Sequence, residues 1–264
     1  MSDAWNRLFF SPAAARSVIA TRVIVIAHAL WIVLSRPGLW SVSPPRELAA
    51  RFGWFFDPDV ERLLFIALIV LLAMALFSRV ACFGAALLLY HFAPLEEALA
   101  RSGDPFMHGL TADVLALAAL AFVPRVRGAA PSPDFRWPVV LVRFAVAAPY
   151  LFSAVAKGIG WFTGPNIADV ARTFSLIGVA PYAKLVIDHA AVAWLIAIGW
   201  LIVSIGMPLA VISRRVAAVI VPLAAIAHVA AIPLFGVIWL ATPLLLVFVD
   251  YSATPNSSAH RASA

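Results

Sequence analysis

The chain consists of long apolar stretches separated by short polar segments. Eight stretches approach the roughly 20 apolar residues that a membrane-spanning helix needs. They cover residues 18–34, 61–77, 79–95, 109–123, 139–157, 190–212, 216–233 and 236–250. This pattern predicts an all-α integral membrane protein, a polytopic bundle of about eight transmembrane helices.

Two pairs of these spans are separated only by a predicted turn. The stretch 216–249 has 34 residues and no charged side chain, which is too long for one crossing, so we place a turn at Pro233–Gly236. The second and third spans form one apolar block that only Ser78–Arg79 interrupts, which predicts a tight hairpin.

Short polar segments flank this membrane domain. We expect residues 1–17, which combine aromatic residues with arginines, to form a cytoplasmic or interfacial segment rather than a cleavable signal peptide. Residues 18–250 form the predicted transmembrane domain. Residues 251–264 are small and polar, which predicts a disordered C-terminal tail.

The composition agrees with a membrane protein and argues against nucleic-acid binding. Apolar residues make up 64% of the chain and charged residues 12%, whereas a soluble domain carries about 25% charged residues. The net charge of +6 comes from arginines in short clusters between the spans, with no basic stripe interleaved with aromatic residues. Such clusters mark cytoplasmic segments and predict that both termini are cytoplasmic. The outer loop 96–108 is accordingly net acidic, although the first outer loop carries three arginines.

Several titratable residues are predicted to lie at the midplane or in the outer half of the bilayer, at about 1.5 Å per helical residue. They are His28, His91, His108, Asp113, Lys157 and His228. Ionisable residues at membrane depth usually face a bundle interior or a water-filled cavity. The pattern therefore predicts a shared site formed by several helices.

These residues also have structural interpretations. Each histidine can hydrogen-bond to a neighbouring helix, Lys157 can anchor the interface beside Trp161, and Asp113 can neutralise Lys157 in an ion pair. Lysine is rare, because 17 of the 19 basic residues are arginines, and an amine can lose its proton whereas a guanidinium cannot. No metal is expected, since HxxxH and HxxE spacings are absent and Cys82 is the one cysteine.

One motif resembles a known family. Arg143, Tyr150 and Lys157 form R-x6-Y-x6-K, followed by W-x-x-G at Trp161–Gly164. This resembles the core motif of the vitamin K-dependent gamma-carboxylase family, whose bacterial relatives are grouped as the horizontally transferred transmembrane domain (HTTM). The stretch FMHGL at 106–110, and His228 followed by Leu234 and Phe235, also resemble family segments.

The resemblance implies a bacterial inner-membrane protein with a reduced vitamin K-type quinone as its cofactor. It implies that Lys157 is the general base and that His108 stabilises the quinol oxygen. The remaining residues expected to contribute to the cofactor site are His91, Asp113, Tyr150, Trp161 and His228. General-base work needs a neutral amine, which agrees with a lysine in apolar surroundings.

The chain also departs from the family. The sixth span offers only Ser204 where many members carry a carboxylate, and the large extramembrane domain of true carboxylases is not in the sequence. A partner protein is therefore expected to supply that domain. Two functions stay open: a quinol-linked enzyme that uses Lys157, and a non-catalytic membrane accessory or binding protein for a secreted peptide or small molecule.

Overall fold

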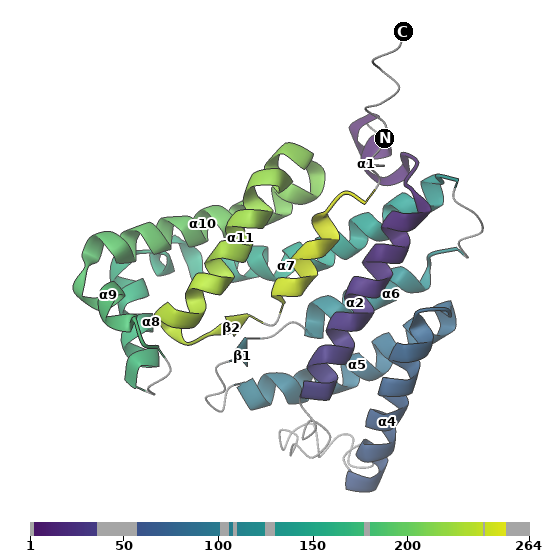
Figure 1. Ribbon diagram of the computed structural model, residues 1–264, viewed down its shortest axis with the longest axis horizontal. Coiled ribbons are helices and arrows are strands. Elements are labelled where there is room, and N and C mark those ends of the chain that lie inside the picture. Colours follow the sequence, from purple (N-terminus) through teal and green to yellow (C-terminus); the bar gives the residue numbers. More distant parts are fainter. Residues whose placement is uncertain are drawn as a thin grey trace, which may run out of the picture.

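The computed structural model describes residues 3–35, 57–100, 106–107, 110–124, 130–176, 180–239 and 241–251. These residues form a helical bundle with one small sheet (Figure 1), so the predicted all-α class is confirmed. The α-helices are α1 (Asp3–Phe10), α2 (Ala15–Ser35), α4 (Pro58–Ala75), α5 (Arg79–Ala100), α6 (Leu110–Ala121), α7 (Arg136–Trp161), α8 (Gly164–Leu176), α9 (Ala183–Asp188), α10 (Ala190–Ile212) and α11 (Arg214–Phe235). Two 3-10 helices, η3 (Pro133–Phe135) and η4 (Thr242–Phe248), and two paired parallel strands, β1 (Phe106–Met107) and β2 (Ile238–Trp239), complete the described chain.

Four helices of the described part are long and apolar enough to cross a membrane. They are α2, the continuous segment of η3 and α7, α10 and α11, and α5 and α6 contain shorter apolar helices. The helix α4 is also apolar but begins with the charged residues Asp59, Glu61 and Arg62. The apolar helices indicate that the protein is associated with a membrane.

Local sequence signals set the ends of these helices. Asp57 caps α4, because its Oδ1 accepts hydrogen bonds from the backbone N–H groups of Asp59 and Val60, and proline follows at position 58. The helix α11 ends at Phe235, where Gly236 adopts a left-handed conformation with φ 67°. The predicted turn at Pro233–Gly236 is thereby confirmed. The predicted hairpin is also confirmed, since α4 ends at Ala75 and α5 begins at Arg79.

The eighth predicted span, 236–250, does not form an α-helix. It contains β2 and η4, yet it runs back along the bundle, because Asp250 Oδ2 lies 3.1 Å from Arg214 Nη1 at the start of α11. The segment packs against α2, α7 and α11, and the Val247 carbonyl accepts a hydrogen bond from Arg143 Nε over 2.9 Å. Non-helical backbone at membrane depth is tolerated where protein covers it. Apolar composition alone does not distinguish this conformation from a helix.

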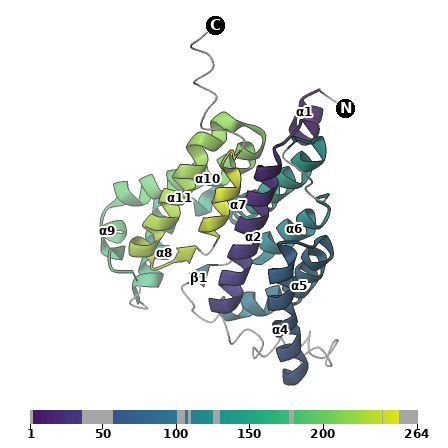
Figure 2. The same cartoon turned by 45° about the vertical axis from the view of Figure 1, so that its right-hand side comes forward.

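Buried apolar side chains form two clusters. The larger one lies among α2, α4, α5, α6 and α7, with parts of α10, α11 and η4. The smaller one joins α8 and α9 to α10 and to the end of α11. In both views α8 and α9 lie on the side away from α4 and α5 (Figures 1 and 2). The apolar pattern predicts no element in residues 158–189, where α8 and α9 form.

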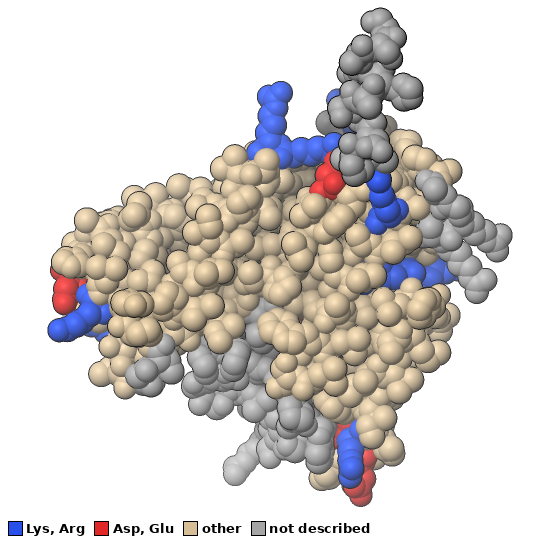
Figure 3. All heavy atoms as spheres, viewed as in Figure 1, with Lys and Arg blue, Asp and Glu red and all other residues tan. Residues whose placement is uncertain are grey.

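The outer surface is largely apolar. Large side chains such as Phe77, Val80 and Leu176 are more than 80% exposed. The Lys, Arg, Asp and Glu side chains visible in Figure 3 lie towards the edges of the face, and the described residues in its broad middle are of other types. A surface of this kind is compatible with contact to lipid tails.

Candidate functional site

The helix α7 carries three of the predicted site residues, Tyr150, Lys157 and Trp161, and is interrupted between the second and the third. Tyr150 follows Pro149, and Lys157 is the last residue before Gly158, which has φ 65° and ψ 170°. This backbone region is essentially restricted to glycine. The predicted span end at residue 157 therefore coincides with a break in the helix, and the last turn of α7 proceeds in a new direction to Trp161.

The amine of Lys157 lies over aromatic rings. Its Nζ is 4.2 Å from the centroid of the Trp161 ring and 5.9 Å from that of Trp200. Trp161 and Trp200 meet edge to face, with centroids 6.3 Å apart. The structure therefore brings Lys157 together with Trp161, as predicted, and adds Trp200 from α10, which sequence reasoning missed.

Tyr150 and His228 form a second contact. It belongs to a chain of hydrogen bonds that determines which group donates and which accepts at each step. The Thr242 hydroxyl donates to the Trp239 carbonyl over 2.6 Å, so its oxygen accepts from His228 Nδ1, 2.9 Å away. Nε2 of the neutral ring is then an acceptor, and the Tyr150 hydroxyl donates to it over 3.0 Å. Since this hydroxyl has one proton, the Tyr150 oxygen can only accept from a further partner.

Two adjacent cavities open beside this chain. The smaller one, of about 160 Å³, has Tyr150, Ser204 and His228 in its wall, and the larger one, of about 320 Å³, is lined mainly by apolar side chains of α10 and α11. Both share Tyr150, His228, Trp200 and Trp239. The ring of His228 stacks on Trp239, with centroids 5.2 Å apart. Trp200 thus contacts the Lys157 amine and also lines both cavities.

These walls fit a planar ring that carries polar oxygens and an apolar tail. Ser204 is 1% exposed, and its Oγ has no hydrogen-bond partner among the described residues. A buried hydroxyl without a partner is unfavourable unless a ligand or water satisfies it. The smaller cavity therefore offers the Tyr150 oxygen and Ser204 Oγ to a polar ring, while the larger one can hold a hydrocarbon chain.

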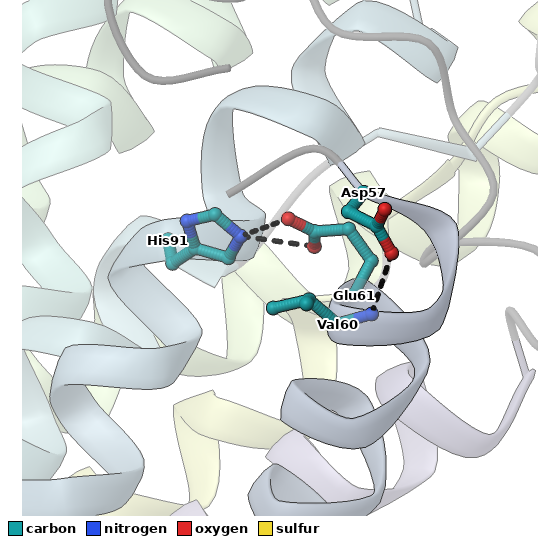
Figure 4. A network of polar contacts seen from close by, with 4 residues as sticks. All are labelled: Asp57, Val60, Glu61 and His91. Carbon is teal, nitrogen blue, oxygen red and sulfur yellow. Dashed lines mark hydrogen bonds and ion pairs between the residues drawn. The ribbon is translucent and has the colours of Figure 1, made fainter. Parts of the chain in front are cut away.

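The other predicted site residues belong to two histidine–carboxylate pairs. His28 Nδ1 lies 2.9 Å from both oxygens of Asp113, and both side chains are fully buried. His91 Nε2 lies 3.0 Å from both oxygens of Glu61, beside the Asp57 cap of α4 (Figure 4). The second pair agrees with the interpretation of a histidine as a hydrogen-bonding group between helices, here α4 and α5.

The structure also bears on the alternative in which Asp113 neutralises Lys157. Asp113 pairs with His28, and Lys157 forms no salt bridge with a described residue. The other predicted catalytic residue, His108, lies outside the described residues. Among the described residues, no group of three His, Cys, Asp or Glu side chains lies close enough to hold a metal ion.

Sequence reasoning missed several residues that complete these contacts. Glu61 is the first residue of the predicted span 61–77 and is not among the predicted site residues. Thr242, Trp200 and Trp239 carry no charge, so the pattern of titratable residues does not indicate them. The sequence does contain a partial signal for the two tryptophans, because a tryptophan at membrane depth is amphipathic and needs a partner for its N–H group.

Comparisons with known proteins do not assign this site. No family model, no curated protein and no solved structure matches the chain. Its function therefore has to be inferred from the residues and their geometry.

Proposed function

We propose that this protein binds a reduced, vitamin K-type quinone and uses Lys157 as a general base in a quinol-linked reaction. The observation that carries the proposal is the hydrogen-bond chain from Trp239 to Tyr150, which leaves the Tyr150 oxygen as an acceptor beside an aromatic cavity. A quinol hydroxyl can donate to this oxygen. The oxidised ring presents only carbonyl acceptors there and cannot.

The cavity residues would bind and orient the ligand. The ring would contact Trp200 and Trp239 in the smaller cavity, with Ser204 as a second polar contact, and an isoprenoid tail would occupy the larger apolar cavity. A bound quinol supplies two electrons and two protons. The stacked aromatic walls exclude water and favour a planar ligand.

Lys157 would accept a proton at Nζ. Its amine lies against two indole rings rather than beside a carboxylate, and a neutral amine can act as a base whereas a guanidinium cannot. The contact of Trp200 with both the amine and the cavities connects Lys157 to the proposed ligand site.

The test replaces Lys157 with arginine or alanine in protein reconstituted into nanodiscs. The rate at which dioxygen oxidises a vitamin K-type quinol to the quinone, followed by absorbance, should fall about 100-fold or more in both variants, because a general base contributes about 10²–10⁴-fold. The matched control is Lys184→Arg, which changes the other lysine, exposed on α9. Wild-type turnover by Lys157→Arg at equal protein levels would show that position 157 needs only a positive charge.

A second candidate function is a non-catalytic binding protein, and one observation favours it. The Lys157 side chain is exposed and its amine lies over Trp161, which is also the arrangement of an interfacial anchor. This candidate predicts that the quinol binds, that its binding weakens in Ser204→Ala and His228→Phe, and that no turnover occurs in the wild type. Co-purified quinone and turnover, measured on the same sample, separate the two candidates.

We also propose that the chain crosses a bacterial inner membrane eight times, seven times as a helix and once as the returning segment 236–250, with both termini cytoplasmic. Two contacts support the placement of both termini on the same side of the membrane. Near the N-terminus, the Leu8 carbonyl accepts a hydrogen bond from Arg136 Nε over 3.1 Å, and near the C-terminus Asp250 pairs with Arg214. The family resemblance leads us to propose a partner protein that presents a substrate. A pull-down from native membranes with the tagged protein tests for such a partner.

A further inference from the structure

A basic cavity lies at the end of the bundle where the segment between α1 and α2 approaches the end of η4. It measures about 380 Å³, within the range of about 300–1,000 Å³ for small-molecule sites. Its walls come from the segment that joins α1 to α2, the starts of α7 and α11, the end of α10 and the end of η4. The cavity is separate from the aromatic cavities, with which it shares none of its lining residues.

Three arginines line this cavity, against a single carboxylate. They are Arg136, Arg143 and Arg214, and the carboxylate is Asp250, so the wall carries a net charge of +2. Arg136 and Arg214 both lie close enough to Arg143 to repel its charge. Arg214 is exposed and pairs with Asp250. Arg136 and Arg143 are partly buried, and two like charges in such a space are costly unless an anion compensates them.

The backbone contacts of two arginines hold their guanidinium groups in place. Arg136 Nε donates to the Leu8 carbonyl over 3.1 Å, and Arg143 Nε donates to the Val247 carbonyl over 2.9 Å. A guanidinium has five N–H donors, and these are the single hydrogen bonds that each group makes to described residues. The terminal nitrogens of both groups therefore have donors available to a ligand in the cavity.

We propose that this cavity binds a phosphate group. Fixed guanidinium forks match the paired oxygens of a phosphate and are the preferred protein group for it. The rest of the wall is apolar, with Val139, Val221 and Phe248 beside the arginines, and this suits the glycerol and first acyl carbons of a phospholipid. Basic pockets between transmembrane helices bind lipid headgroups in this way. The inference does not depend on the proposed quinol chemistry.

The experiment measures thermal unfolding of the full chain in uncharged detergent. One arm adds phosphatidylglycerol, with phosphatidylcholine as the matched lipid, and a second arm adds inorganic phosphate at constant ionic strength. The variants are Arg143→Gln and Arg136→Gln, which remove one lining arginine each. Arg215→Gln is the control, because Arg215 is exposed next to Arg214 but does not line the cavity.

Saturable stabilisation of the wild type is expected in one arm, with an apparent affinity at least about tenfold weaker in both cavity variants and unchanged in the control. An effect of phosphatidylglycerol alone identifies a lipid headgroup, and an effect of inorganic phosphate identifies a soluble phosphate compound. The proposal is wrong if neither probe stabilises the wild type, or if Arg215→Gln weakens the effect as much as the cavity variants. If Arg143→Gln does not fold, because it also loses the Val247 contact, Arg136→Gln decides the outcome.

Discussion

Replacing Thr242 with valine should release the orientation of His228. Valine has nearly the shape of threonine but lacks the oxygen that accepts from His228 Nδ1 over 2.9 Å and donates to the Trp239 carbonyl over 2.6 Å. His228 is 6% exposed, so water does not readily replace the lost acceptor. The ring can then move its proton to Nε2 and present a donor to Tyr150, which reverses the hydrogen bond between them.

The expected loss in the free energy of unfolding follows from these contacts. A buried donor left without an acceptor costs about 1–3 kcal/mol. The Thr242→Val variant strands the Trp239 carbonyl together with either the His228 Nδ1–H or, after tautomer exchange, the Tyr150 O–H. We therefore expect a loss of about 1–3 kcal/mol in the free energy of unfolding. Thr242→Ser keeps the hydroxyl and loses one methyl group, so it should cost no more than about 1 kcal/mol.

Two measurements check this prediction. Denaturant titration in mixed micelles gives the free energy of unfolding, and ¹⁵N NMR of histidine-labelled protein reports which ring nitrogen of His228 carries the proton. The wild type and Thr242→Ser should show the proton on Nδ1, whereas Thr242→Val should show a mixture or Nε2. Protonation of Nε2 in the wild type would refute the assigned direction of the chain, and with it the acceptor role of Tyr150.

Three further predictions concern the backbone break, a buried pair and the topology. Gly158→Ala should lose about 1–3 kcal/mol of stability, measured by denaturant titration, because its φ of 65° with ψ of 170° excludes a side chain, whereas Gly160→Ala should be tolerated. Asp113→Leu should lower the free energy of unfolding by about 3–5 kcal/mol, because it leaves the buried His28 without its partner. The double variant with His28→Leu should lose clearly less, and additive losses of the two single variants would contradict this coupling. Reporter fusions at both termini should report the same compartment, and a fusion after Arg172 the opposite one.

Much of the helical path was predictable, because apolar length and turn residues determine it. The break after residue 157 and the turn at Pro233–Gly236 both follow from glycine positions visible in the sequence. The conformation of 236–250 was not predictable, since its apolar side chains suit a helix, a strand or a 3-10 helix equally. Tertiary contacts determine the conformation of this segment, namely the pairing of β2 with β1 and the packing of η4 against α2.

The candidate site was predictable only as a set of residues. The sequence placed the titratable groups at similar depths, but depth does not say which helices face each other. The structure separates Asp113 and His91 into pairs with His28 and Glu61, and it unites Tyr150 with His228. The uncharged residues that connect the site could be identified only once the helices were placed.

The returning segment 236–250 has a consequence for how the protein is made. A long α-helix can enter the bilayer alone because it satisfies its own backbone, whereas the short strand β2 and the ends of the seven-residue 3-10 helix η4 would expose unpaired polar groups to lipid. In the proposed topology, this segment would therefore enter a groove formed by α2, α7 and α11, against which η4 packs. Insertion and tertiary folding would then be a single event for this segment.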